Sequence, residues 1–147
     1  MPFSDEEQII VTERPKITNA ILLVGAGLFF ISLFMVAFCT DKGCRPSYEA
    51  FLIGWMVMLG GGAGISWLAN PLLIVSWILL DKNRKLAWLF AFLAVIFSLS
   101  FLSFDRVLEN EAGHYGIVQS VGAGYWLWVS SCIVTFLSTV LIKLNRK

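Results

Sequence analysis

The feature that most constrains this chain is a run of 31 residues, from Ala50 to Leu80, that contains no charged side chain. As a single helix rising 1.5 Å per residue, it would be about 46 Å long, well beyond a hydrocarbon core of about 30 Å. Two spanning helices of about 20 residues each do not fit into the same run. The question is therefore how often the chain crosses a membrane here.

Three further uncharged runs, residues 17–39, 86–104 and 125–142, indicate the class of protein. Each is long enough, or nearly so, to cross a bilayer as a helix of about 20 residues. Hydrophobic residues make up 58% of the chain and charged residues 14%, whereas soluble domains are about 45–50% apolar and about 25% charged. This pattern predicts an integral membrane protein.

The distribution of lysine and arginine decides the number of crossings, because these residues stay on the cytoplasmic side of spanning segments. If the long run crosses once, most of these residues lie inside and only Lys42, Arg45 and Arg106 lie outside. If it crosses twice, most of the basic residues lie outside instead. The residues placed inside by one crossing are Arg14, Lys16, Lys82, Arg84, Lys85, Lys143, Arg146 and Lys147. One crossing is therefore favoured.

The predicted fold is an all-α integral membrane protein, with four transmembrane helices in an antiparallel bundle. The spans are about 17–39, 61–80, 86–104 and 123–143, and the cytoplasmic tail is 1–16. The outer segments are 40–60 and 105–122, and 81–85 is a tight inner turn. Both termini are expected in the cytoplasm, most simply at a bacterial inner membrane.

The long run has more residues than one crossing requires. Its first part is expected to form a short outer segment, Ser47 to Leu59, that is either interfacial or re-entrant. The glycines between Gly60 and Gly64 would then provide the bend, because glycine adopts backbone angles that other residues resist. The alternative is one long, strongly tilted helix.

Small and hydroxyl-bearing residues recur at helical spacing and predict packing faces, since small residues let membrane helices approach closely. We interpret these stripes as contacts inside the bundle, with a homodimer contact as the alternative. They are Gly60 and Gly64, a GxxxG spacing, for the second span, Ala87, Ala91 and Ala94 in the third, and Ser131, Thr135 and Thr139 in the fourth.

Asn70 and Pro71 form the most polar feature at the expected midplane of the membrane. Proline lacks a backbone N–H and frees the carbonyl of Trp67, four residues earlier. A freed carbonyl beside an amide could hold a cation or a polar ligand, as in the broken helices of transporters. We favour a simple kink, in which Asn70 bonds to a neighbouring helix through Ser98 or Thr135.

Two outer features carry other reactive side chains. Cys39 and Cys44 bracket a short loop, so a structural disulfide is expected if the compartment is oxidising. His114 is the only histidine of the chain, and a single loop histidine predicts neither a metal site nor a pH switch.

Aromatic residues near the ends of the spans predict belts at the two membrane interfaces. A surface that recognises a lipid or a partner is the alternative. The outer belt would contain Tyr48, Trp55, Tyr125, Trp126 and Trp128, and the inner belt Trp77 and Trp88.

The apolar runs contain no ionisable side chain, which argues against proton relays and coupled transport. No metal-ligand cluster, phosphate-binding loop or nucleophile–base pair is evident, so we expect no enzyme, no cofactor and no metal. No basic stripe suggests nucleic acid. Besides the lipid bilayer, the expected partner is another integral membrane protein, and the chain would be its accessory or scaffolding subunit.

Two alternatives remain. The first is a homo-oligomeric pore or membrane-perturbing protein, whose path the Ser131, Thr135 and Thr139 hydroxyls would line. The second is an uncoupled small-molecule transporter that uses Asn70 and Pro71.

Overall fold

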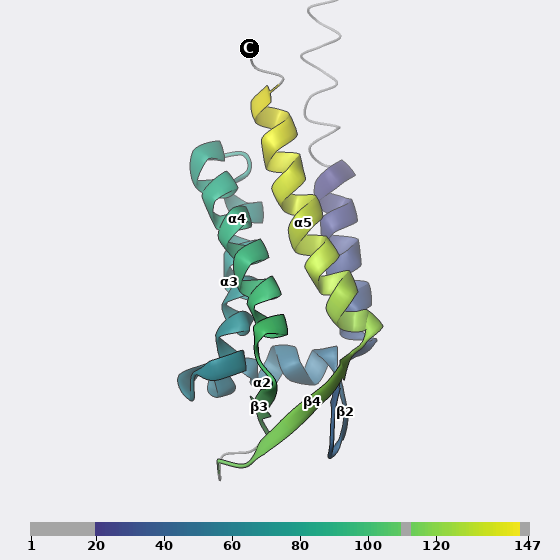
Figure 1. Ribbon diagram of the computed structural model, residues 1–147. Helices are drawn as coiled ribbons and strands as arrows, with labels where there is room; N and C mark the ends of the chain where they lie inside the picture. Colours follow the sequence, from purple (N-terminus) through teal and green to yellow (C-terminus); the bar gives the residue numbers. More distant parts are fainter. Residues whose placement is uncertain (1–19, 110–112, 145–147) are drawn as a thin grey trace, which may run out of the picture.

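The computed structural model describes residues 20–109 and 113–144, so the predicted tail 1–16 lies outside the described residues. The helices Ala20–Leu33, α3 (Ala69–Leu79), α4 (Arg84–Ser100) and α5 (Ala123–Leu144) run side by side (Figure 1). The helix α2 (Ser47–Leu59) lies across one end of this bundle, together with all the strands of the described chain. At the same end, the short 3-10 helices η1 (Gly62–Leu68) and η2 (Phe101–Ser103) adjoin α3 and α4.

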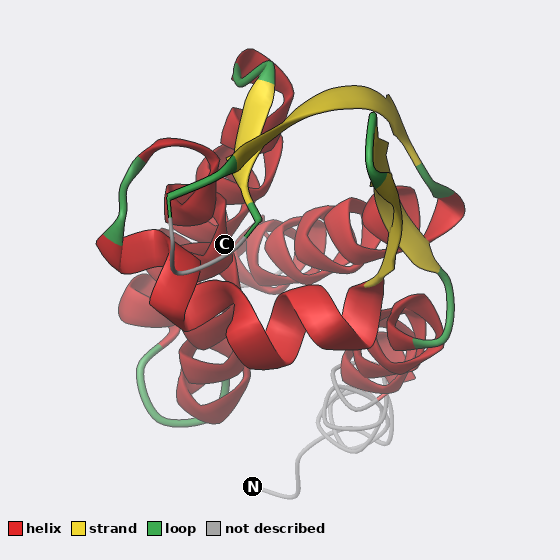
Figure 2. Ribbon diagram, turned by 90° about the horizontal axis from the view of Figure 1, so that it is seen from below, coloured by secondary structure: helices red, strands yellow, loops and turns green. Residues whose placement is uncertain are grey.

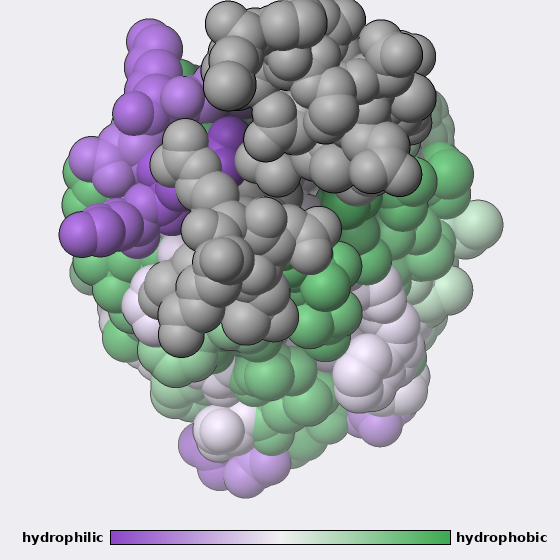
Figure 3. All heavy atoms as spheres, turned by 90° about the horizontal axis from the view of Figure 1, so that it is seen from above, coloured by the Kyte–Doolittle hydropathy of each residue, from purple (hydrophilic) through white to green (hydrophobic). Residues whose placement is uncertain are grey.

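Three helical stretches are long and apolar enough to cross a membrane: Gly62–Leu79, Arg84–Ser103 and Ala123–Leu141. They match the second, third and fourth predicted spans closely. The described helix Ala20–Leu33 is apolar but shorter. Viewed along the bundle, hydrophilic side chains gather over the turn between α3 and α4, and apolar side chains cover the visible flanks (Figure 3).

The prediction of an all-α fold is wrong, because the segments between the helices form a four-stranded antiparallel sheet. Its order is β2-β1-β4-β3, and Figure 2 shows β4 arching over the end of the bundle. The strands are β1 (Val36–Thr40), β2 (Gly43–Pro46), β3 (Arg106–Leu108) and β4 (Tyr115–Val121). Residues 36–39, predicted as the end of the first span, therefore belong to a strand.

Long-range pairing explains this difference. In β1, Phe38 lies opposite Val121 of β4, and Cys39 lies opposite Ser120. A short apolar segment such as VAFC is compatible with either helix or strand. β1 pairs on one edge with the nearby β2, in a short hairpin, and on the other with β4, about 80 residues away. Hydropathy alone reveals neither pairing.

The long uncharged run is divided by a reversal of the chain, and the alternative of one tilted helix is wrong. Helix α2 ends at Leu59, and Gly61 and Gly62 follow with φ angles of 74° and 62°. These angles lie in the left-handed region, which side chains with a Cβ rarely adopt. The glycine cluster therefore turns the chain from α2 into η1 and α3.

Small side chains allow the bundle to close. Ala87, Ala91, Ala94 and Ser98 are the buried residues of α4, while large side chains such as Leu89 and Ile96 are exposed. The packed centre of the bundle contains Phe29, Leu73, Ala94 and Cys132. A second apolar cluster lies at the sheet end of the bundle and includes Phe101, Val107, Tyr125 and Val129.

Candidate functional site

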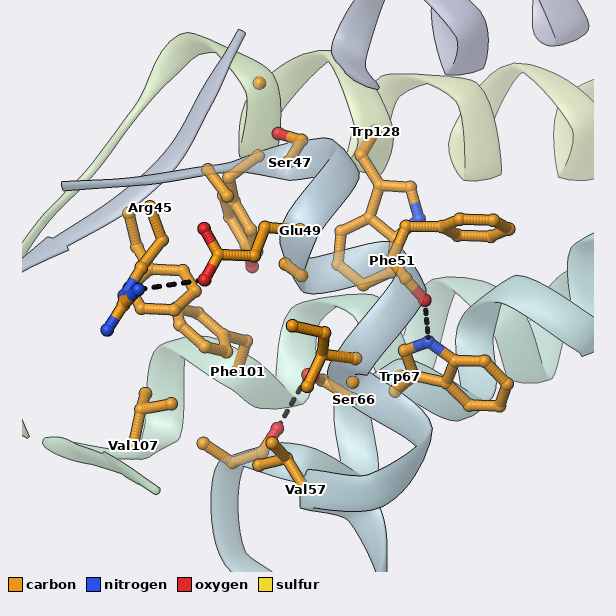
Figure 4. A pocket seen from close by; sticks show the side chains of 18 of the residues that line it. Arg45, Ser47, Glu49, Phe51, Val57, Ser66, Trp67, Phe101, Val107 and Trp128 are labelled. Atoms are coloured by element: carbon orange, nitrogen blue, oxygen red, sulfur yellow. Dashed lines mark hydrogen bonds and ion pairs between the residues drawn. The ribbon is translucent and has the colours of Figure 1, made fainter. Parts of the chain in front are cut away.

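A cavity of about 170 Å³ lies between α2 and the end of the bundle. Figure 4 shows its side chains converging from α2, η1, α5 and the sheet end of the molecule. Its walls are largely apolar, and the aromatic lining includes Phe29, Phe51, Trp67, Phe101, Tyr125 and Trp128.

Two local interactions hold α2 in place over the cavity. The indole N–H of Trp67 in η1 donates to the carbonyl of Phe51 in α2 at 2.8 Å. Gly54 lies beneath the Trp67 ring, where a Cβ would overlap the indole. The missing side chain of Gly54 therefore lets η1 and α2 approach closely.

The charged groups at the cavity are all paired. Arg45 Nη1 lies 2.8 Å from Glu49 Oε1, and both side chains are partly exposed. The Glu109 side chain is only 7% exposed, and its Oε2 lies 3.6 Å from Lys42 Nζ. Its Oε1 accepts a hydrogen bond of 2.6 Å from the hydroxyl of Thr40. These pairs leave the wall with no uncompensated charge.

Ser47 differs from the other polar groups of the wall. It is the first residue of α2, and its backbone N–H donates to the carbonyl of Met35 at 2.9 Å. Its hydroxyl is buried beside Gly124 and has no hydrogen-bond partner. By contrast, the hydroxyl of Ser66, on the same cavity, donates to the carbonyl of Ala63 at 2.7 Å.

Asn70 and Pro71 lie in the first turn of α3, where it continues from η1. Proline is tolerated in a first turn, because the N–H it lacks has no partner within the helix there. Asn70 is buried, and its Oδ1 accepts the indole N–H of Trp128 at 2.9 Å. The predicted partners, Ser98 and Thr135, are therefore wrong. Pro71 lies just after the change from the 3-10 helix η1 to the α-helix α3.

The predicted aromatic belt divides into two groups. Tyr48, Trp55 and Trp126 are exposed at the end of the bundle where α2 lies. Trp88 stacks on Phe92 on α4.

The other group forms hydrogen bonds within the bundle, and its place in a belt stays a prediction. Tyr125 is buried and donates to the carbonyl of Ser98 at 2.9 Å. Trp77 donates to Thr135 Oγ1 at 2.9 Å, and Trp128 donates to Asn70. These three side chains connect helices.

The hydroxyl stripe of α5 lies inside the bundle. Ser131, Thr135 and Thr139 are buried, and the Ser131 hydroxyl donates to the carbonyl of Gly25 at 2.8 Å. The Thr139 hydroxyl donates to the carbonyl of Phe136 within α5.

Gly60 and Gly64 do not form one helix face, so their predicted GxxxG contact is wrong. Gly60 ends α2, and Gly64 lies beyond the reversal, in η1. A Cβ at Gly64 would overlap the backbone carbonyl of Val57. This glycine therefore permits η1 to fold back on α2.

Cys39 and Cys44 face each other across β1 and β2 and are joined by a disulfide. The carbonyl of His114 accepts the backbone N–H of Glu109 at 2.8 Å. Within residues 20–109 and 113–144, no three histidine, cysteine, aspartate or glutamate side chains are grouped to hold a metal ion.

Comparison with known proteins yields no match: no family model fits the chain, and neither a curated protein nor a solved structure is significantly similar to it. The function must therefore be argued from the arrangement of the residues.

Proposed function

We propose that this chain is a non-catalytic accessory protein of a cell membrane, with four spanning helices and both termini in the cytoplasm. Its α2 and sheet would lie on the outer side, where they bind another integral membrane protein. The exposed side of α2 supports this proposal. Five of its six exposed large apolar side chains recur at helical spacing: Tyr48, Leu52, Trp55, Met56 and Leu59. The sixth, Ile53, borders the cavity.

This stripe is unusual because the opposite side of α2 is apolar too. Phe51 and Val57, on that side, line the cavity. Helices that lie on lipid generally carry lysine or arginine on a polar face, but α2 has no basic residue, and Glu49 is its only charged one. Tyrosine, tryptophan and methionine are enriched in protein interfaces. A protein partner therefore fits this stripe better than the bilayer surface does.

The alternatives have less support. In a pore, Ser131 and Thr135 would need to face a water-filled path, but both are buried and bonded within the bundle. In a transporter, Asn70 would need to offer its oxygen to a substrate, but that oxygen already accepts a hydrogen bond from Trp128.

Photocrosslinking in native membranes tests the accessory role. A benzophenone amino acid at Leu52 or Leu59 of α2 should form one discrete adduct with another membrane protein. The same probe at Leu89 or Ile96, which are also apolar and exposed but lie on α4, should not form it. A Leu52→Ser, Leu59→Ser variant should stay folded and lose the partner on purification, because both side chains are exposed. Adducts of equal yield from α2 and α4, or self-adducts alone, would contradict the proposal.

A further inference from the structure

The cavity behind α2 has the size and surface of a site for one small apolar group. Its volume is about 170 Å³, and an apolar cavity of about 150 Å³ in another protein accommodates benzene. Ligand sites are typically lined by aromatic and aliphatic side chains with a few polar groups that fix orientation. Phe51, Phe101 and Trp128 provide such walls here.

The electrostatics of the wall favour an uncharged ligand. Arg45 is paired with Glu49, and Glu109 is paired with Lys42 and bonded to Thr40. A charged ligand would have to break one of these pairs or leave its own charge without a partner in an apolar cavity, and both are costly.

One polar group of the wall lacks a partner. The hydroxyl of Ser47 is buried without a hydrogen bond, and buried polar groups in proteins are nearly always bonded to protein, water or ligand. A hydroxyl both donates and accepts, so it suits a neutral hydrogen-bonding group such as an alcohol.

From these observations we infer that the cavity between α2 and the bundle binds a small uncharged amphipathic molecule. The apolar part of the ligand, a ring or the end of a chain, occupies the apolar interior. Its single polar group bonds to Ser47, whose hydroxyl packs against Gly124 in the unliganded structure and turns toward the ligand on binding. This site is independent of the exposed α2 stripe, since the two lie on opposite sides of the helix.

Tryptophan fluorescence of the purified full chain in detergent tests this inference. The probe is 4-bromobenzyl alcohol, whose bromine quenches only nearby indoles, and Trp67 and Trp128 both line the cavity. We expect a saturable quenching component above the linear effect of partition into the micelle. Ala50→Leu, which fills the cavity from α2, should abolish that component.

A matched pair of serine variants separates binding from folding. Ser47→Ala should weaken probe binding about five- to tenfold, the effect of losing one hydrogen bond, without lowering the stability of the unliganded protein. Ser66→Ala should leave probe affinity unchanged, because its hydroxyl is already bonded to Ala63.

Charged analogues test the chemistry of the ligand. The alcohol should bind more tightly than either 4-bromobenzylamine or 4-bromobenzoate. The inference is overturned if the wild-type chain shows no saturable quenching, if Ala50→Leu retains it, or if Ser47→Ala binds the alcohol as tightly as the wild type does. Tighter binding of the amine would assign the site to cations held by Glu49 and Glu109 instead.

Discussion

At the level of residues, hydrogen bonds donated by two indole N–H groups connect α3 and α5. The N–H of Trp128 on α5 donates to Asn70 on α3, and the N–H of Trp77 on α3 donates to Thr135 on α5. These bonds link the same two helices at different depths. Each indole also packs its ring in the bundle, so its contribution combines apolar contact with a directional bond.

Trp128→Phe should lower the free energy of unfolding by about 1–2 kcal/mol, because it leaves the buried Asn70 oxygen without a donor. Trp126→Phe is the control: it changes an exposed ring two residues away on the same helix, and we expect about 0.5 kcal/mol or less. Unfolding in mixed detergent, monitored by circular dichroism, measures both. Equal losses in the two variants would show that the Trp128–Asn70 bond contributes nothing.

Spacing in the sequence predicts some of these residues but not others. The alanines of α4 form its buried face, as their four- and three-residue steps indicate. Trp77, Tyr125 and Trp128 could not be placed, since an aromatic residue near a helix end suits an interface or a core equally well. No sequence pattern indicates that Ser47, Glu49 and Glu109 line a cavity, because the cavity wall is formed by residues that are distant from one another in the sequence.

At the level of elements, the glycines that end α2 determine where the long uncharged run folds back. Gly61 is followed by Gly62, and both have positive φ angles with open space around them. Glycine is therefore required at these two positions by the backbone conformation and not by crowding from neighbouring atoms.

Gly61→Ala should destabilise the protein by about 1–3 kcal/mol, since Gly61 combines a φ of 74° with a ψ of −160°, a backbone region that essentially only glycine adopts. Gly27→Ala makes the same chemical change inside the helix Ala20–Leu33, where nothing lies within 4 Å of the added Cβ. It should be neutral or stabilising by up to about 1 kcal/mol, because alanine is the better helix former. Thermal unfolding compares the two; a loss at Gly27 as large as that at Gly61 would contradict a conformational origin.

The helices were more predictable than the strands for a physical reason. Apolar periodicity and length are local properties, and they predicted α2 and the helical stretches from Gly62, Arg84 and Ala123 well. A strand depends on its partners, and β1 pairs both with β4, across most of the sequence, and with β2, in a hairpin too short to show a hydropathy pattern. An outer segment read only for hydropathy is therefore easily taken for a loop or for the end of a span.

At the level of the whole molecule, the two ends of the bundle differ in chemistry. The sheet, the Cys39–Cys44 disulfide and α2 lie at one end. The turn between α3 and α4 lies at the other, where Lys82, Arg84 and Lys85 are exposed. Disulfides persist in oxidising compartments, and lysine and arginine near spanning segments remain in the cytoplasm. Both rules give the same orientation for the molecule, although one concerns redox chemistry and the other concerns insertion.

Cysteine labelling in intact cells tests this orientation. A membrane-impermeant maleimide should label Tyr115→Cys, an exposed position on β4, without permeabilisation. Asn83→Cys, in the exposed α3–α4 turn, should react only after the membrane is opened. The native cysteines give little background, because two are joined in the disulfide and Cys132 is buried. The reverse pattern would place the disulfide in the cytoplasm and the basic turn outside, against both rules; the proposed outer contact through α2 would then have to lie in the cytoplasm.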